Sequence, residues 1–129
     1  MSTQSEPQFT VERTEDFLRA WSSGNVERIM SFFTDEPVMF ASAGSEPHGG
    51  GACHGYDEVR AAAESFVEHF PTANYEGQRI AVGPDEGFVT WRFEGVTKDG
   101  TTVSYDGCDV LLFEGDRIAV KSGYRKINV

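Results

Sequence analysis

Hydrophobic residues recur at helical spacing near the start of the chain and predict two consecutive helices. Thr10 can cap the first helix, and Gly24 follows its last turn, where glycine is favoured. Asn25 can cap the second helix, which the Asp-Glu-Pro segment at residues 35–37 stops. The hydrophobic positions are Val11, Phe17, Leu18 and Trp21 in the first helix and Val26, Ile29, Met30 and Phe33 in the second.

A short strand is predicted at residues 38–41, where four hydrophobic residues follow a proline. Residues 42–55 show no hydrophobic periodicity and are rich in glycine, which is typical of a loop. A third helix is predicted to begin near Tyr56 and to end before Pro71. Its buried stripe comprises Val59, Ala62, Ala63, Phe66, Val67 and Phe70.

From residue 75 onward the hydrophobic spacing changes to two, which is typical of strands. The four predicted strands cover residues 75–82, 88–97, 101–113 and 118–126, and short turn-forming segments separate them. Helices first and hairpin-connected strands later predict an α+β protein. We expect a cone-shaped, strongly curved antiparallel sheet, with the three helices of the N-terminal half on one of its faces.

Length and composition fit a single domain over residues 1–129, in which residues 1–8 form a polar lead. The chain has 39% hydrophobic and 12% aromatic residues, which is ample for one core. Its formal net charge of -10 repels phosphate backbones, so nucleic acid is not an expected partner. No hydrophobic run reaches the roughly 18 residues that cross a bilayer. We therefore expect a cytoplasmic protein with no membrane partner.

The sequence gives no reason to expect a cofactor or a metal ion. The glycines at residues 49–51 lack the spacing of dinucleotide and phosphate-binding loops. The three histidines, His48, His54 and His69, are scattered, and no metal-binding spacing occurs. Cys53 and Cys108 are expected to be free thiols, because a domain with this core needs no disulfide.

Residues 108–113 are hydrophobic on both faces of their predicted strand, apart from Asp109. Such a strand needs cover on both sides, and the helices can supply only one of them. We expect a second copy of the chain to cover the other, giving a homodimer through the outer face of the sheet.

Asp109 is the first candidate for chemistry, because it shares its face of the strand with Gly107, Leu111 and Phe113. That face should point towards the helices. Burial there would raise the pKa of the carboxyl group and let it donate a hydrogen bond to a substrate oxygen. The alternative is a structural role, in which the carboxyl group bonds a buried backbone N–H, tyrosine or histidine.

Four segments resemble the nuclear transport factor 2-like superfamily, which includes ketosteroid isomerase and SnoaL-like polyketide cyclases. They are Phe-Leu-Arg-Ala-Trp-Ser-Ser-Gly-Asn at residues 17–25, Phe-Phe-Thr-Asp at 32–35, Gly-Tyr-Asp-Glu-Val-Arg at 55–60 and Asp-Val-Leu-Leu-Phe-Glu-Gly-Asp-Arg-Ile at 109–118. The resemblance covers nearly the whole chain. It implies a curved sheet wrapped around a long helix, an apolar pocket between them and a dimer through the outer sheet surface.

The resemblance also assigns roles to particular residues. Asp109 resembles the neutral carboxylic acid of the ketosteroid isomerase oxyanion hole. Phe17 stands where that enzyme has a tyrosine and Ala41 where it has its general base, so steroid isomerisation is not carried over. His54 is a candidate replacement base, and the alternative is a solvent-exposed side chain or a hydrogen bond at the helix end. Tyr124 shares a face with Val120 and Ser122, and by resemblance that face lines the pocket.

The expected function is binding of a small apolar, oxygen-bearing molecule, with cofactor-independent acid/base catalysis of an isomerase, cyclase or dehydratase type. Asp109 and His54 are the candidate catalytic residues. A non-catalytic ligand-binding module, or an accessory subunit, is the alternative. The residues expected to line the binding site are Phe17, Trp21, Tyr56, Phe66, Trp91, Leu111 and Tyr124.

Overall fold

A computed structural model describes residues 7–43 and 51–127 of the chain. Its elements, in chain order, are α1 (Val11–Ser23), α2 (Val26–Met30), β1 (Phe33–Phe40), β2 (Ala52–His54), α3 (Tyr56–His69), β3 (Thr72–Val82), β4 (Glu86–Val96), β5 (Thr102–Glu114) and β6 (Arg117–Arg125). The predicted first and third helices and the four predicted C-terminal strands are confirmed, with small shifts at their ends. The glycines at residues 49 and 50, and His48, lie outside the described residues.

Side-chain caps define the helices near the N-terminus, as the sequence predicts. The Thr10 hydroxyl accepts a hydrogen bond from the backbone N–H of Arg13 at 3.0 Å, and Gly24 ends α1 with a φ of 73°. The Asn25 side chain accepts a hydrogen bond from the backbone N–H of Arg28 and begins α2. These caps fix the direction of α1, which carries Phe17, Leu18 and Trp21 into the core.

The second helix is shorter than predicted, because the chain leaves α2 at Met30 and enters β1 at Phe33. Phe33 and residues 35–37 therefore belong to a strand. The backbone N–H of Ile118 donates to the Phe32 carbonyl at 2.8 Å, and Phe33 pairs with Ile118 of β6. Sheet pairing and burial of Phe33 outweigh a local spacing that also fits a helix.

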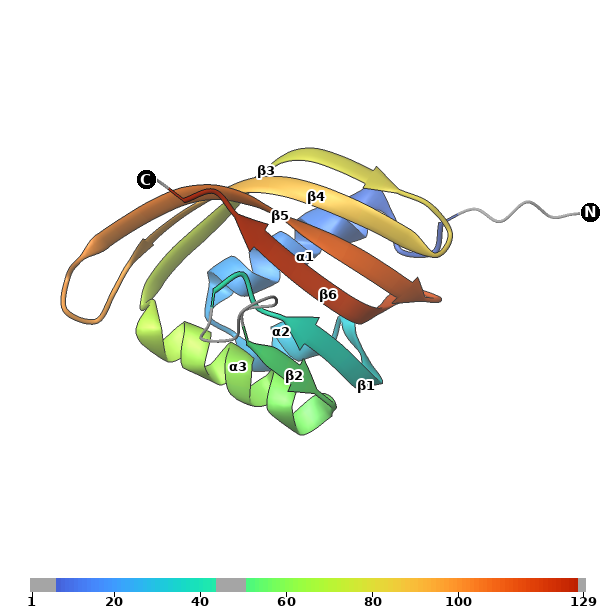
Figure 1. The fold of residues 1–129 in the computed structure, drawn as a ribbon, viewed down its shortest axis with the longest axis horizontal. Helices are drawn as coiled ribbons and strands as arrows, with labels where there is room; N and C mark the ends of the chain where they lie inside the picture. Colours follow the sequence, from blue (N-terminus) through green and yellow to red (C-terminus); the bar gives the residue numbers. More distant parts are fainter. Residues whose placement is uncertain (1–6, 44–50, 128–129) are drawn as a thin grey trace, which may run out of the picture.

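The six strands form one sheet in the order β2-β1-β6-β5-β4-β3. The hairpins β3–β4, β4–β5 and β5–β6 are antiparallel, whereas β1 runs parallel to β6. The sheet is therefore mixed, not wholly antiparallel as expected from the hairpins. Figure 1 shows the long strands curving over the helices, in a cone-shaped α+β arrangement.

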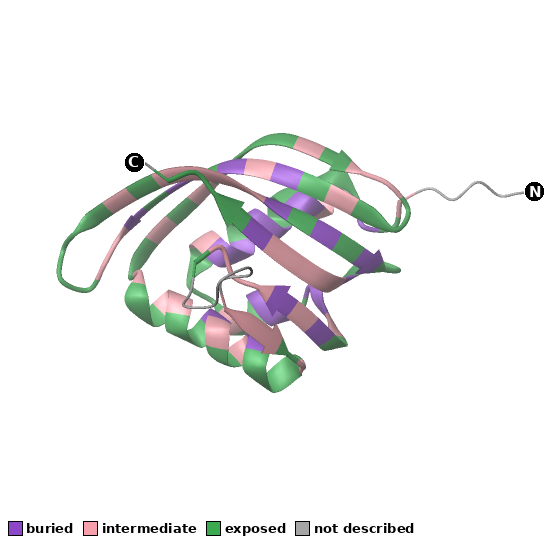
Figure 2. Cartoon of the chain, viewed as in Figure 1, coloured by how far each residue is buried: buried purple, intermediate pink, exposed green. Residues whose placement is uncertain are grey.

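The core lies between the concave face of the sheet and the helices. Residues alternate between more buried and more exposed positions along β4 and between buried and exposed from Asp109 to the end of β5, as Figure 2 shows. Leu111 and Phe113 are buried on the same face as Asp109, which confirms the predicted face of that strand. Val110 and Leu112 point to the other side and are exposed.

Three further features of the described residues concern the cysteines, groups of metal-binding side chains and membrane-spanning helices. Cys53 and Cys108 are free thiols. Among residues 7–43 and 51–127, no three or more histidine, cysteine or acidic side chains are arranged to hold a metal ion. No helix within the same residues has the length and hydropathy to span a membrane.

Candidate functional site

Asp109 lies in the interior, on the face of β5 that points towards the helices. The residue is only 3% exposed. Its neighbours across the sheet are Val89 on β4 and Gly123 on β6. A Cβ atom at Gly123 would lie 3.3 Å from Asp109 Oδ1, so glycine there leaves room for the carboxyl group.

Lys121 on β6 is the partner of this carboxyl group, and sequence reasoning missed it. Lys121 Nζ lies 3.5 Å from Asp109 Oδ1, and the two side chains are 14% and 4% exposed. Lys121 pairs with Leu111 in the β5–β6 register, which turns its side chain to the inner face. Its ammonium group also lies 5.2 Å from the centre of the Trp21 ring. A buried ion pair therefore bridges two neighbouring strands.

Two opposing effects set the protonation of Asp109. Burial raises the pKa of its carboxyl group above the ordinary value, because the charged form loses its solvation. The Lys121 ammonium opposes this rise by stabilising the carboxylate. The Trp91 indole also favours the charged form, although it makes no well-formed hydrogen bond. The net pKa remains raised, so the proton is held more tightly than on an exposed aspartate.

Three buried polar atoms in this region have no hydrogen-bond partner among the described residues: Asp109 Oδ1, Trp21 Nε1 and Trp91 Nε1. Trp21 and Trp91 are 6% and 2% exposed. A buried polar atom without a partner is costly, and native proteins contain few of them. Asp109 Oδ1 has its ion pair with Lys121, and the two indole N–H groups have no acceptor among the described residues.

Aromatic side chains form the wall around these polar atoms. Phe66 of α3 contacts Trp21, with ring centres 5.2 Å apart, and Tyr75 of β3 at 6.0 Å. Tyr75 in turn packs edge-on against Trp91 at 5.0 Å. Burial, followed by the nearby Asp109 charge, raises the pKa of Tyr75 well above its ordinary value, so its hydroxyl stays protonated. Tyr75 is a second interior residue that the sequence analysis did not select.

His54 does not lie beside Asp109, so the structure does not bring these two candidate catalytic residues together. His54 is opposite Val38 in the β1–β2 ladder, whereas the adjacent pair Met39 and Cys53 faces the core. Its ring contacts Phe40 at 6.4 Å on the outer side, and its side chain is exposed. Its backbone N–H donates to a Glu58 carboxylate oxygen at 2.8 Å. The exposed imidazole fits the alternative of a solvent-exposed histidine, because the contact with Glu58 is made by the backbone and not by the ring.

The face predicted for Tyr124 is also wrong. Tyr124 is opposite Cys108, and both alternate with inward-facing residues, so the tyrosine points to the outer side of the sheet. It is 57% exposed. Val120 and Ser122 share this outer face with it, as expected, but that face does not contain Asp109.

The other predicted lining residues divide into an interior group and one at the edge. Trp91 and Leu111 lie on the inner face of the sheet, and Trp21 and Phe66 oppose them from the helices. Phe17 is fully buried behind Trp21, with their ring centres 6.2 Å apart. Tyr56 opens α3 and is exposed. The structure thus places Trp91 beside Asp109 and Trp21 beside Lys121, with Phe66 packed against Trp21, whereas His54 and Tyr124 lie elsewhere.

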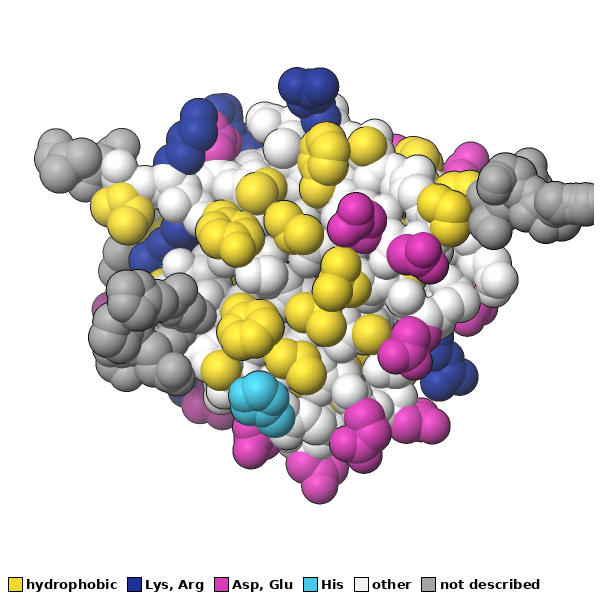
Figure 3. Space-filling model, turned by 45° about the vertical axis from the view of Figure 1, so that its right-hand side comes forward, with side chains coloured by type: hydrophobic (Ala, Val, Ile, Leu, Met, Phe, Trp, Pro, Cys, Tyr) yellow, Lys and Arg dark blue, Asp and Glu magenta, His cyan; other side chains and the backbone are white. Residues whose placement is uncertain are grey.

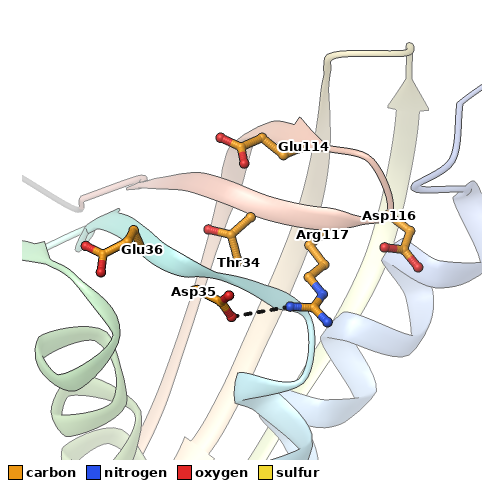
Figure 4. Close-up of a pocket in the computed structure, with 6 residues that line it drawn as sticks. All are labelled: Thr34, Asp35, Glu36, Glu114, Asp116 and Arg117. Carbon is orange, nitrogen blue, oxygen red and sulfur yellow. Dashed lines mark ion pairs between the residues drawn. The ribbon is translucent and has the colours of Figure 1, made fainter.

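A separate, acidic surface pocket lies where β1 approaches the β5–β6 turn (Figure 4). Its lining residues are Thr34, Asp35, Glu36, Glu114, Asp116 and Arg117. Arg117 Nη1 lies 3.5 Å from Asp35 Oδ1, but both side chains are well exposed to solvent. Solvent screening makes such a pair weak. This pocket is a solvated polar surface and lies apart from Asp109.

The fold and the interior site define a cone-shaped α+β domain with a buried acid–base pair under its sheet. A family model described as a SnoaL-like domain matches residues 14–121. The chain belongs to this SnoaL-like family, within the nuclear transport factor 2-like superfamily that its sequence resembles. No curated protein matches it.

Solved structures show the same fold at low sequence identity. A nuclear transport factor 2-like protein from Anabaena variabilis has a TM-score of 0.79 and 15% identity, over 99% of this chain and 96% of that one. A hypothetical protein with a ketosteroid isomerase-like fold from Catenulispora acidiphila, in complex with trimethylamine, has a TM-score of 0.77 and 15% identity, over 89% of this chain and 85% of that one. SalBIII, an epoxide hydrolase/cyclase-like enzyme of pyran ring formation in salinomycin, has a TM-score of 0.74 and 18% identity, over 90% and 89%. These likenesses establish the fold.

Proposed function

We propose that this protein binds a small, mostly apolar, oxygen-bearing molecule beneath the sheet and that Asp109 and Lys121 exchange a proton with it. The observation that carries the proposal is the buried ion pair, whose Asp109 Oδ1 lacks a hydrogen bond while Lys121 Nζ lies 3.5 Å away. Buried charges are retained at a cost in stability. One reason to retain buried charges is that a site transfers protons in apolar surroundings.

The pair can divide the work of acid/base catalysis. The Lys121 ammonium can donate a proton to a ligand oxygen, and the Asp109 carboxylate can accept one from a neighbouring carbon. This replaces the Asp109 and His54 division, since His54 lies on the outer side of the sheet. The Trp21 and Trp91 N–H groups can hold the same ligand by hydrogen bonds. The reaction class would be that of an isomerase, cyclase or dehydratase.

The relatives are consistent with a small-molecule site in this fold. One of them is described as an epoxide hydrolase/cyclase-like enzyme, and another was crystallised with trimethylamine. Because fold alone does not define a reaction, the proposal rests on the interior residues of this chain.

Reversible binding without turnover is the second candidate function. It is favoured by Phe17, a fully buried phenylalanine at the position where the ketosteroid isomerase resemblance places a tyrosine of the oxyanion hole. In that case the same pair would orient a ligand but would not react with it.

The two candidates are separated by a panel of cyclic enones, ketones and epoxides, with binding followed by tryptophan fluorescence and turnover by NMR. Asp109→Asn should abolish turnover if the protein is an enzyme, and should change only affinity if it is a binding module. Asp106→Asn is the matched control, because Asp106 lies on the same strand in an outer pair with Arg92. Failure of every compound to bind the wild type would contradict the proposal.

We also propose that a second copy of the chain covers the outer face of the sheet. Phe88, Val110, Leu112 and Tyr124 are large exposed hydrophobic residues on this face. Figure 3 shows one face of the molecule with many exposed hydrophobic side chains and acidic groups along an edge.

Sedimentation should give twice the chain mass of 14.2 kDa for the wild type. Leu112→Lys should yield monomers. Val11→Lys, at an equally exposed hydrophobic residue on α1, should not change the mass. A monomeric wild type would refute the dimer.

A further inference from the structure

We propose that Lys121 is an amine nucleophile that forms a covalent iminium with an aldehyde or ketone bound beneath the sheet. This inference rests on the proposed small-molecule site and names the class of ligand that it takes. It is carried by three observations: the burial of the Lys121 side chain, its 3.5 Å approach to Asp109, and the aromatic surroundings of both groups.

The setting of Lys121 differs from that of the other lysines in the chain. The sequence contains three lysines, and the other two, Lys98 and Lys126, are exposed. The Lys98 ammonium pairs with Glu68 at 3.1 Å in a solvated contact. A lysine amine in an apolar site, next to a group that can take its proton, is suited to attack a carbonyl carbon.

Asp109 can act as the proton carrier in every step of this reaction. It first takes a proton from the Lys121 ammonium, and the Nζ lone pair then attacks the carbonyl carbon, so that an N–C bond forms and the C=O π electrons move to oxygen. Asp109 returns the proton to that oxygen and takes a second proton from the nitrogen. It then protonates the hydroxyl group, the C–O bond breaks as water leaves, and the nitrogen lone pair forms the C=N bond of the iminium. No oxidant, reductant or further reactant is needed.

The charge distribution of the site accommodates the iminium as well as it accommodates the ammonium. The lysine carries one positive charge before the reaction, as the ammonium, and one afterwards, as the iminium. Asp109 carries one negative charge at both stages, so the buried pair stays balanced. The Trp21 ring, 5.2 Å from Nζ, can stabilise either cation through its face. Phe66 and Tyr75 supply apolar walls for the rest of an aromatic or aliphatic carbonyl compound.

The test is reductive trapping of the full chain with cinnamaldehyde and sodium cyanoborohydride. Cyanoborohydride reduces an iminium to a stable secondary amine, which peptide mass mapping assigns to one lysine. We expect Lys121 to be labelled at least about tenfold faster than Lys98 or Lys126, because the site holds the aldehyde against the amine. Asp109→Asn should slow the labelling by about a hundredfold through loss of the proton carrier.

Lys121→Arg is the matched control, because arginine keeps the positive charge next to Asp109 but has no nucleophilic amine. Its folding is checked by tryptophan fluorescence, and it should lose the label at residue 121. Equal labelling of all three lysines in the wild type would overturn the inference.

Cinnamyl alcohol separates this inference from the function on which it rests, because the alcohol can bind but cannot form an iminium. Binding of the alcohol without selective labelling of Lys121 by the aldehyde would refute the covalent step and leave the binding site standing. Absence of binding by both compounds would refute the inference and the proposed function together.

Discussion

Replacing Lys121 by methionine leaves the Asp109 carboxylate without its partner in the interior. At the observed separation of 3.5 Å, the attraction is worth about 5 kcal/mol with an effective dielectric constant of about 20. Removing the lysine also ends the cost of burying its own charge, which offsets part of this loss. Breaking buried pairs by removing one partner typically costs about 3 to 5 kcal/mol. We therefore expect Lys121→Met to lower the free energy of unfolding by about 3 kcal/mol at pH 8.

This loss should depend on pH in a direction that the pKa of Asp109 determines. Burial already raises that pKa in the folded protein, and removal of the lysine raises it further. A carboxyl group with a raised folded pKa binds its proton more tightly in the native state than in the unfolded state. Its contribution is therefore fully present below the unfolded pKa of about 4 and is lost as the pH rises through the folded pKa. The effect of Lys121→Met should be small near pH 4 and grow towards pH 8.

Urea unfolding followed by tryptophan fluorescence at pH 5 and pH 8 measures this difference. Trp21 and Trp91 are both buried next to the Asp109–Lys121 pair, so a change in their fluorescence reports unfolding of this part of the core. Arg92→Met is the control, because it breaks the solvated pair with Asp106 on the outer face. The pKa of Asp106 is lowered by Arg92, so the effect of that variant should change only at more acidic pH.

A double variant, Asp109→Asn with Lys121→Met, separates the unpaired charge from lost packing. Neutral replacements of both partners are often tolerated, so the double variant should recover most of the loss caused by Lys121→Met. The reasoning is refuted if Lys121→Met costs the same at pH 5 and pH 8, or if the double variant is as unstable at pH 8 as the single one.

Three further predictions concern packing, capping and thiol reactivity. Gly107→Ala should cost about 1 to 3 kcal/mol in urea unfolding, because its Cβ would overlap the Tyr124 carbonyl oxygen and the Trp91 ring, whereas Gly51→Ala has open space and should be neutral. Thr10→Ala should cost about 1 kcal/mol through loss of the α1 cap, and Thr10→Ser should retain stability in the same assay. Burial raises the pKa of the Cys108 thiol, so Cys108 should react with iodoacetamide more slowly than free cysteine at pH 8.

The sequence was most informative where local chemistry determines an element. Thr10 begins α1 because its hydroxyl accepts a hydrogen bond from a free backbone N–H of the first turn. Gly24 ends α1 because glycine readily adopts the left-handed conformation found there. The second helix was predicted too long because the spacing of Phe33 fits both a helix and a strand. Pairing of Phe33 with Ile118, far away in the chain, decides between them, and no local pattern contains that information.

The candidate site shows the same limit at the level of single side chains. A period of two correctly groups Val120, Ser122 and Tyr124 on one face of β6, but it does not say which face points inwards. The register of β6 against β5 settles this, since Leu111 is opposite Lys121. The same period groups Asp109 with Leu111 and Phe113, which are buried, but its strand is hydrophobic on both faces, so this spacing alone does not fix which face points inwards.

Lys121 was missed because its strand reverses the usual arrangement of polar and apolar residues. In β6, Lys121 and Gly123 occupy positions on the inner face of the sheet, while Val120 and Tyr124 lie on the outer face. A lysine between a valine and a serine would ordinarily be placed in solvent. Local patterns of this kind tend to fail at functional positions, where stability is given up for chemistry. The reversal in β6 places the ammonium group 3.5 Å from Asp109, the acidic residue at an inward position of β5. Two charged residues at inward positions, Asp109 on β5 and Lys121 on β6, therefore lie next to each other. Their proximity favours a functional site over two independent exceptions to the hydrophobic pattern.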